Sequence, residues 1–323
     1  MLTRRQFLAA GSTAGFLASS AFARANTSVR IATLKGGTVA WEIDTIVRNG
    51  FDQKHGISLS VVPVAGKLSA DVLLAAGEAD VIVTDWIWVS RQRHAGADYT
   101  FFPYSRQVGS IIVMAQSELR SLADLKGKSI GVAGGPTDKS WILLRALAKM
   151  ENGFDLANDV IPVYAAPALL NEKLLTGEIE AVITFWHFAA VLKANGAREI
   201  ANIAEAAIML GLDPETPLLG YVYSEKWSRQ NADAAQKLAA ASKDAKALLA
   251  RDDAEWTRLK PMMNYKTDAE YETLKAGFRA GIPNSNLINR ASAEKLFSLL
   301  GEYGGTELVG EYPTLAPGTF ASG

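Results

Sequence analysis

Aromatic, hydroxyl and charged side chains gather where the predicted strands of this sequence end. Five of the seven tryptophans fall at a strand exit or in the first turns of the next helix: Trp41, Trp86, Trp88, Trp141 and Trp186. Indole rings placed there suit a planar heterocycle or a cation, at about 0.5–2 kcal/mol per cation–π contact. Open α/β sheets bind ligands beyond the carboxyl ends of their strands. The candidate ligand-binding residues are therefore Lys35, Gly37, Thr38, Trp41, Asp85, Trp86, Trp88, Gly135, Thr137, Asp138, Trp186 and His187.

Each type of candidate also has a structural interpretation. About half of the tryptophans are expected to fill gaps between helix and sheet, Trp141 first among them, whereas Trp86 and Trp186 are the best pocket candidates. Asp85 and Asp138 would either bind a cationic ligand or cap the helices they precede, and capping is the stronger interpretation for Asp138. The Gly-Gly turns offer free backbone N–H groups for an anion, yet glycine is also an ordinary turn residue.

Residue types and motifs needed for catalysis are scarce. The chain has three histidines and no cysteine, so thiol nucleophiles, disulfides and zinc–thiolate sites are excluded. We find no Gly-x-Ser-x-Gly, His-Glu-x-x-His, calcium-loop, phosphate-loop or dinucleotide motif. Lysine and arginine total 33 against 34 acidic residues, which excludes the basic excess of a nucleic-acid-binding protein. We expect no enzymatic activity, no cofactor and no metal.

Two segments one hundred residues apart repeat each other. Residues 77–86 read GEADVIVTDW and residues 177–186 read GEIEAVITFW, each after a helical stretch containing Leu-Leu. Each half also begins with a short apolar strand, a Gly-Gly turn and a helix, over residues 39–53 in the first half and about 138–150 in the second. The alternation of buried strands and helices predicts an α/β fold with mostly parallel sheets. Helices are expected over residues 232–249, 253–262, 268–280 and 292–300.

The first 25 residues are typical of a secretion signal. Arg4 and Arg5 precede Phe-Leu, an apolar stretch of small residues follows, and Ala23-Arg24-Ala25 supplies a small-x-small site. The twin arginines resemble the twin-arginine export signal. We expect cleavage near Ala25, the twin-arginine export machinery as a partner and a periplasmic mature chain with a net charge of −4.

The stretches SLADLKGKSIGV (residues 121–132), GEADV (77–81) and FDQKHGI (51–57) resemble the periplasmic solute-binding proteins of ABC importers. The closest branch serves nitrate, taurine, alkanesulfonates and thiamine pyrimidine precursors. The resemblance implies a two-lobed, type II periplasmic-binding-protein fold with two hinge crossings. Lobe 1 is expected over residues 26–110 and 217–323, and lobe 2 over residues 111–216. Carried over by position, Thr38, Trp41, Asp85, Trp86, Thr137 and Trp186 would face the ligand.

The resemblance predicts a monomeric receptor that captures a small organic solute between its lobes and delivers it to an inner-membrane ABC permease. The tryptophans and Asp85 favour an aromatic, heterocyclic or cationic ligand over an oxyanion. An exported enzyme on the same fold is an alternative, with His187 and either Asp85 or Asp138 as acid and base. A receptor for a metal ion or metal chelate, using Asp85 and His187, is a third interpretation.

Overall fold

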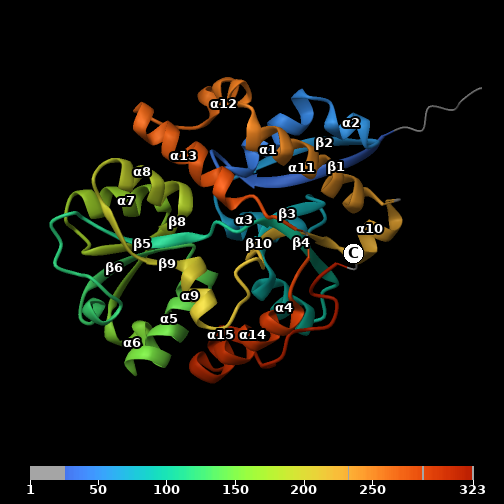
Figure 1. The fold of residues 1–323 in the computed structure, drawn as a ribbon. Coiled ribbons are helices and arrows are strands. Elements are labelled where there is room, and N and C mark those ends of the chain that lie inside the picture. Colours follow the sequence, from blue (N-terminus) through green and yellow to red (C-terminus); the bar gives the residue numbers. More distant parts are fainter. Residues whose placement is uncertain (1–25, 232, 286, 322–323) are drawn as a thin grey trace, which may run out of the picture.

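Two five-stranded sheets form the framework of the molecule. A computed structural model describes residues 26–231, 233–285 and 287–321; the expected signal peptide lies outside these residues. The first sheet has the order β2-β1-β3-β10-β4 and the second β7-β6-β8-β5-β9 (Figure 1). The strands are β1 (Thr27–Leu34), β2 (Ile57–Val64), β3 (Val81–Asp85), β4 (Tyr99–Ser105), β5 (Gly109–Val113), β6 (Ser129–Ala133), β7 (Ile161–Ala165), β8 (Ala181–Phe185), β9 (Arg198–Asn202) and β10 (Leu219–Ser224).

The two sheets share one topology, as the sequence repeat predicts. β1 pairs in parallel with β2 and β3, and β6 pairs in parallel with β7 and β8. One strand in each sheet runs against the others: β10 in the first and β5 in the second. Both antiparallel strands come directly after the chain has crossed between sheets. The mostly parallel α/β architecture is therefore confirmed.

Helices cover the faces of both sheets. The first half contains α1 (Val39–Arg48), α2 (Phe51–Lys54), α3 (Lys67–Ala75) and α4 (Trp86–His94); the second contains α5 (Lys139–Asn152), α6 (Leu156–Asp159), α7 (Pro167–Leu175), α8 (Trp186–Ala194) and α9 (Ile203–Met209). A single 3₁₀ turn (Ala123–Leu125) precedes β6. The single helix predicted over residues 39–53 is two helices, because Gly50 adopts a left-handed conformation with φ +66° and breaks the run.

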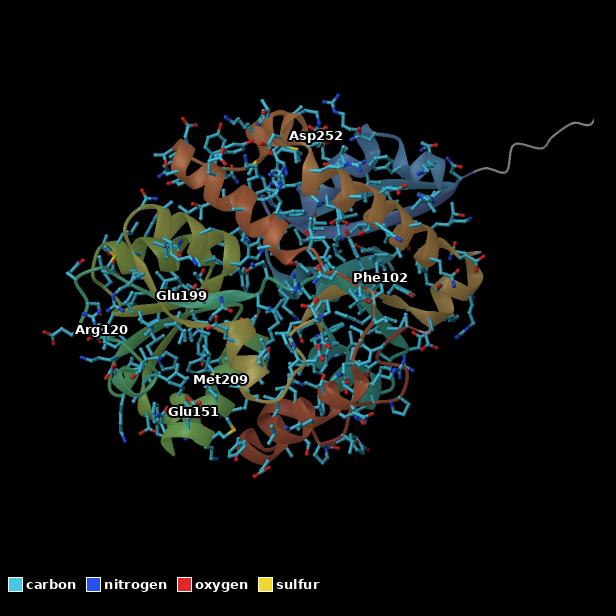
Figure 2. All side chains as sticks on the ribbon, viewed as in Figure 1. Phe102, Arg120, Glu151, Glu199, Met209 and Asp252 are labelled. Atoms are coloured by element: carbon cyan, nitrogen blue, oxygen red, sulfur yellow. The ribbon has the colours of Figure 1, made fainter. Side chains whose placement is uncertain are left out.

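The C-terminal region is helical, as predicted, and it contacts both halves. It consists of α10 (Glu225–Gln230), α11 (Ala234–Arg251), α12 (Asp253–Leu259), a 3₁₀ turn (Lys260–Met262), α13 (Asp268–Gly281), α14 (Arg290–Gly304) and α15 (Thr306–Val309). α11 packs on α1 beside the first sheet, whereas α13 packs on α8 and α14 on α5 beside the second. Figure 1, and Figure 2 in the same view, show this region in orange and red along the upper, right and lower sides of the molecule.

No helix within the described residues is both long and apolar enough to cross a membrane.

Candidate functional site

Two adjoining cavities lie between the sheets. The inner cavity has a volume of about 100 Å³ and the outer cavity about 530 Å³. Both are lined by the turn after β1, the start of α3 and the start of α8, and residues Leu34, Gly37, Lys67, Phe185 and His187 line both. Since these elements come from both sheets, a solute in either cavity would touch both halves of the molecule. We call the two cavities together the cleft.

The carboxyl ends of parallel strands lie beside the cleft. β1 ends at Leu34, and α1 begins at Val39 after a short turn. β8 ends at Phe185, and α8 begins at the next residue. Gly36 makes the first turn with φ +74°, and a Cβ there would lie 2.8 Å from the Asn264 side chain. The positive φ therefore favours glycine at this position, whereas the Asn264 side chain could move aside for a larger residue.

Three polar atoms in the wall of the inner cavity are buried without a hydrogen-bond partner. They are the Tyr104 hydroxyl, Oδ2 of Asp138 and Nδ1 of His187. Burial raises the pKa of Tyr104 well above its usual range. Burial lowers the pKa of His187 to about 4, so its imidazole is neutral at pH 7. Buried polar groups normally have partners, so these three atoms leave hydrogen-bonding capacity around one cavity that a polar solute could use.

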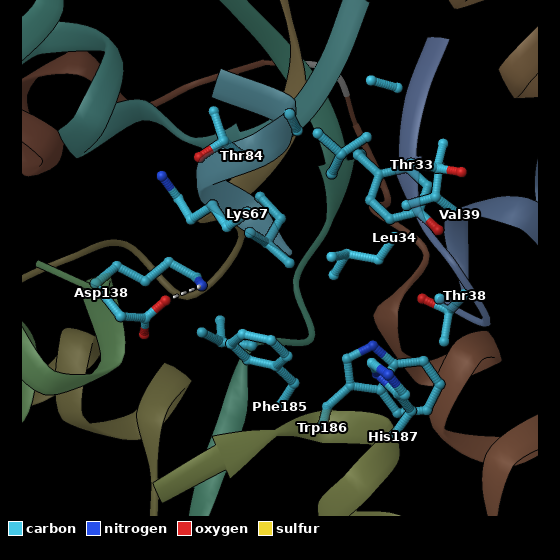
Figure 3. Close-up of a pocket in the computed structure, with 18 residues that line it drawn as sticks. Thr33, Leu34, Thr38, Val39, Lys67, Thr84, Asp138, Phe185, Trp186 and His187 are labelled. Atoms are coloured by element: carbon cyan, nitrogen blue, oxygen red, sulfur yellow. Dashed lines mark ion pairs between the residues drawn. The ribbon is translucent and has the colours of Figure 1, made fainter. Parts of the chain in front are cut away.

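Asp138 and Lys139 form a buried pair at the start of α5. Their side chains are 1% and 6% exposed, and Nζ of Lys139 lies 3.7 Å from Oδ2 of Asp138. The other carboxylate oxygen, Oδ1, accepts the Ser140 backbone N–H at 2.8 Å and caps the helix. The ammonium group also lies over the Phe185 ring, 5.6 Å from its centroid. Figure 3 shows this ion pair on the side of the cavity opposite Trp186 and His187.

Lys67 is the second cation of the cleft. Its Nζ lies 3.0 Å from Asp71 Oδ2, one turn further along α3, and 5.1 Å from the ring centroid of Trp88. Burial raises the pKa of Asp71 despite the neighbouring ammonium group. Each lysine lining the inner cavity therefore has a carboxylate of its own, and the two pairs carry no net charge.

Trp186 forms the aromatic end of the cleft. Its ring packs edge-on against Trp41 at 6.3 Å, and Trp41 packs against Trp256 at 6.0 Å. Gly277 of α13 lies directly behind it, because a Cβ there would be 2.7 Å from the Trp186 ring. The cavity wall is thus connected to both α1 and α13.

A buried ionic cluster supports the wall behind Tyr104. Glu42 Oε1 accepts hydrogen bonds from Tyr221, Ser242 and Lys246 at 2.8, 2.6 and 2.9 Å. Nζ of Lys246 also lies 4.6 Å from the Tyr104 ring centroid. Burial lowers the pKa of Lys246, while Glu42 raises it in opposition. The cluster holds the Tyr104 ring from behind and leaves its hydroxyl beside the cavity.

A family model described as NMT1/THI5 like matches residues 47–255, more than half of the chain. The chain belongs to this family.

Solved structures with the same two-lobed fold include two sulfonate-binding proteins. The alkanesulfonate-binding protein SsuA from Xanthomonas axonopodis pv. citri, bound to MOPS, has a TM-score of 0.72 at 20% identity, over 91% of this chain and 98% of that chain. The periplasmic aliphatic sulphonate binding protein SsuA from Escherichia coli has a TM-score of 0.70 at 18% identity, over 91% and 97%. The desulfurization enzyme DSZB has a TM-score of 0.60 at 18% identity, over 92% and 96%. At these identities the likeness establishes the fold.

One curated relative of this NMT1/THI5-like protein is described as "Putative thiamine biosynthesis protein", from Haemophilus influenzae. It is 27% identical over 138 residues, which are 42% of this chain and 42% of that protein. The match therefore spans less than half the length of the relative.

Seven of the twelve sequence candidates line the cleft of this NMT1/THI5-like protein. Thr38, Asp138 and Trp186 line the inner cavity, Lys35 and Gly135 the outer one, and Gly37 and His187 both. They come from the exits of β1, β6 and β8, which is where the repeat places them.

The other five candidates are absent from the lining of both cavities, and three of them are tryptophans. Trp41 is buried behind Trp186, and its indole N–H donates to the Met262 carbonyl at 3.3 Å. Trp86 is 0% exposed within the core. Asp85 caps α4 by accepting the Trp88 backbone N–H at 2.7 Å.

The remaining two candidates are Trp88 and Thr137. Trp88 stacks on Tyr99, with ring centroids 5.5 Å apart, and does not line either cavity. Thr137 is exposed on the turn before α5, which points it away from the lining. Trp186 is therefore the one tryptophan among the lining residues of the two cavities.

The lining residues that sequence analysis missed include two lysines and two tyrosines: Lys67, Lys139, Tyr104 and Tyr164. β2 and β7 hold corresponding positions in the two sheets. Lys67 follows β2 and Tyr164 lies at the end of β7, so the sequence repeat could have located both. Tyr104 lies on the crossing strand β4, for which the repeat gives no signal.

The described residues contain no group of three or more His, Asp or Glu side chains arranged to hold a metal ion. Asp85 caps α4 and lines neither cavity, whereas His187 lines both.

Proposed function

We propose that this protein is the solute-binding component of an ABC-type importer. It holds a small organic solute in the cleft and delivers it to a membrane permease. The observation that carries the proposal is the set of three buried, unpartnered polar atoms, contributed by both halves and gathered around one cavity. Membership of the NMT1/THI5-like family and the fold of the sulfonate-binding proteins agree with it.

The proposed lobes are residues 26–110 with 217–323 and residues 111–216, joined at the two crossings between β4 and β5 and between α9 and β10. A ligand that contacts both lobes shifts the open–closed equilibrium by its differential affinity for the two states. Aromatic side chains in the lining, Tyr104, Phe185 and Trp186, favour a flat organic solute. The proposed site of action is the periplasm, reached through a twin-arginine signal cleaved near Ala25.

The first test is mass spectrometry of the solute released when the purified protein is denatured. Adding that solute back should decrease the radius of gyration in X-ray scattering without chemical change to the solute. A tight-binding solute that leaves the scattering curve unaltered would refute the hinge. Chemical conversion of the solute would instead favour the exported-enzyme alternative, which His187 and Asp138 of the inner cavity and the fold of the desulfurization enzyme support.

The second test is the substitution Tyr104→Phe, which removes one hydroxyl from the inner cavity. Loss of a hydrogen bond to the solute should weaken binding about 2- to 10-fold. Tyr223→Phe is the matched control, because Tyr223 is also buried but lines neither cavity. Equal affinities for the two variants, measured by calorimetry, would show that the solute makes no hydrogen bond with Tyr104 and would contradict the role proposed for this hydroxyl.

A further inference from the structure

The Asp138–Lys139 pair differs from an ordinary buried ion pair in being incomplete. Both side chains are more than nine-tenths buried, yet their charged atoms are 3.7 Å apart, beyond hydrogen-bond distance. Oδ2 of Asp138 has no hydrogen-bond partner. Lys139 has no hydrogen bond from its ammonium group to any described residue; its contacts are the long ion pair and the Phe185 ring. The pair thus offers one open acceptor and one open donor, side by side.

Local structure holds the acceptor in place. Oδ1 of Asp138 accepts the Ser140 backbone N–H as the helix cap. This hydrogen bond fixes the orientation of the carboxylate and leaves Oδ2 free. Gly134, with φ +85°, brings the turn before α5 close to this oxygen, since a Cβ there would lie 2.6 Å from Oδ2. Any larger residue would displace the carboxylate from the cavity wall.

We propose that Asp138 sets the charge specificity of the cleft, an inference that rests on the proposed function. The pair selects a solute with an uncharged edge that carries a hydrogen-bond donor next to an acceptor, as a primary carboxamide does. The donor of the solute donates a hydrogen bond to Oδ2 of Asp138, and its acceptor accepts a hydrogen bond from Nζ of Lys139. A sulfonate carries acceptors only, so it satisfies Lys139 and faces Asp138 with like charge.

The charges around the inner cavity agree with this selection. Lys67 and Lys139 are each neutralised by a nearby carboxylate, Asp71 at 3.0 Å and Asp138 at 3.7 Å. The third lysine of the cleft, Lys35, lines only the outer cavity. In the absence of Asp138, the ammonium of Lys139 would be an uncompensated buried cation and a strong site for an oxyanion.

The substitution Asp138→Asn separates charge from structure. Asparagine caps a helix as well as aspartate does, so α5 keeps its first turn while the cavity loses one negative charge. Asp252→Asn is the matched control: Asp252 caps α12 by accepting the Ala254 backbone N–H at 2.8 Å and lines neither cavity. Thermal unfolding of both variants checks that the fold is retained.

The experiment titrates butane-1-sulfonate and benzamide into the full mature chain by calorimetry at low ionic strength. The sulfonate should bind Asp138→Asn at least about 10-fold more tightly than it binds the wild type or Asp252→Asn, because a like charge near contact distance has been removed. Benzamide, which keeps one of its two hydrogen bonds, should bind the variant more weakly than it binds the wild type.

Sulfonate affinity that is the same in wild type and Asp138→Asn, whether strong or weak, overturns the inference. The released solute distinguishes this failure from failure of the proposed function. If that solute binds and compacts the wild type while Asp138→Asn leaves the affinities for both probes unchanged, the receptor function stands and Asp138 has no part in specificity. If no solute is released and no compaction occurs with any compound, the proposed function fails.

Discussion

Acid should destabilise this protein through His187, and the effect can be calculated from the burial of the side chain. His187 lies at the start of α8, next to the rings of Phe185, Trp186 and Phe188, and its Nδ1 has no partner. Burial lowers its pKa from 6.5 to about 4. Between pH 6.5 and about pH 4, the unfolded chain binds a proton at this imidazole that the native chain does not bind. The free energy of unfolding therefore falls as the pH falls through this range.

The size of the effect follows from the two pKa values. The lowering of the His187 pKa from 6.5 to about 4 corresponds to roughly 3 kcal/mol, because one pKa unit corresponds to about 1.36 kcal/mol. Between pH 7 and pH 4.5, about 2 kcal/mol of this is expected, since protonation of the native state limits the loss near its own pKa. Glutamine does not titrate, so His187→Gln should lose about 2 kcal/mol less than the wild type over this range.

Urea unfolding of both proteins at several pH values between 7 and 4.5 measures this difference. Tyr104→Phe is the control, because it removes another polar group of the inner cavity that does not titrate in this range. It should keep the full acid dependence of the wild type. If His187→Gln has the same dependence as the wild type, the imidazole is charged and solvated in the native state, and the argument from burial is wrong.

Two further predictions concern the packing behind Trp186 and the export of the precursor. Gly277→Ala should destabilise the native state by about 1–3 kcal/mol in urea unfolding, because the added methyl group overlaps the Trp186 ring; the gain in stability of about 1 kcal/mol that alanine gives an unobstructed helix would contradict this packing. Replacing both Arg4 and Arg5 with lysine should leave the precursor in the cytoplasm in cell fractionation, whereas unchanged periplasmic recovery would show that another export route is used.

The sheet framework could be predicted from the sequence because its signals are local. Each of the two repeated segments, residues 77–86 and 177–186, contains one buried strand of the framework, β3 (Val81–Asp85) and β8 (Ala181–Phe185). Each follows a glycine with positive φ, Gly77 at +70° and Gly177 at +77°, which ends the preceding helix at a defined place. The run of β-branched residues that follows is short and buried on both faces, and such runs form strands in parallel sheets.

The cleft could be predicted only in part, because lining a cavity depends on what the distant chain covers. Lys139 illustrates this: the sequence places it next to the predicted helix cap Asp138, but its contact with the Phe185 ring depends on the way β8 ends beside α5. Asp85 and Asp138 both cap helices, yet only the second also lines the cleft. Helix capping is encoded within a few residues, whereas cavity lining is set by elements far apart in the chain.

Trp86 and Trp186 show this distinction most clearly, because the repeat makes them equivalent. Each is the first residue of the helix after its strand. The C-terminal segment covers Trp86: Phe320 packs on its ring at 5.7 Å and bridges to Phe101 of β4. Trp186 is backed by Trp41 and α13 on one side and faces the cavity on the other. One half of the pseudo-symmetric pair is therefore core and the other is the aromatic wall, and the difference comes from a segment more than two hundred residues away from Trp86.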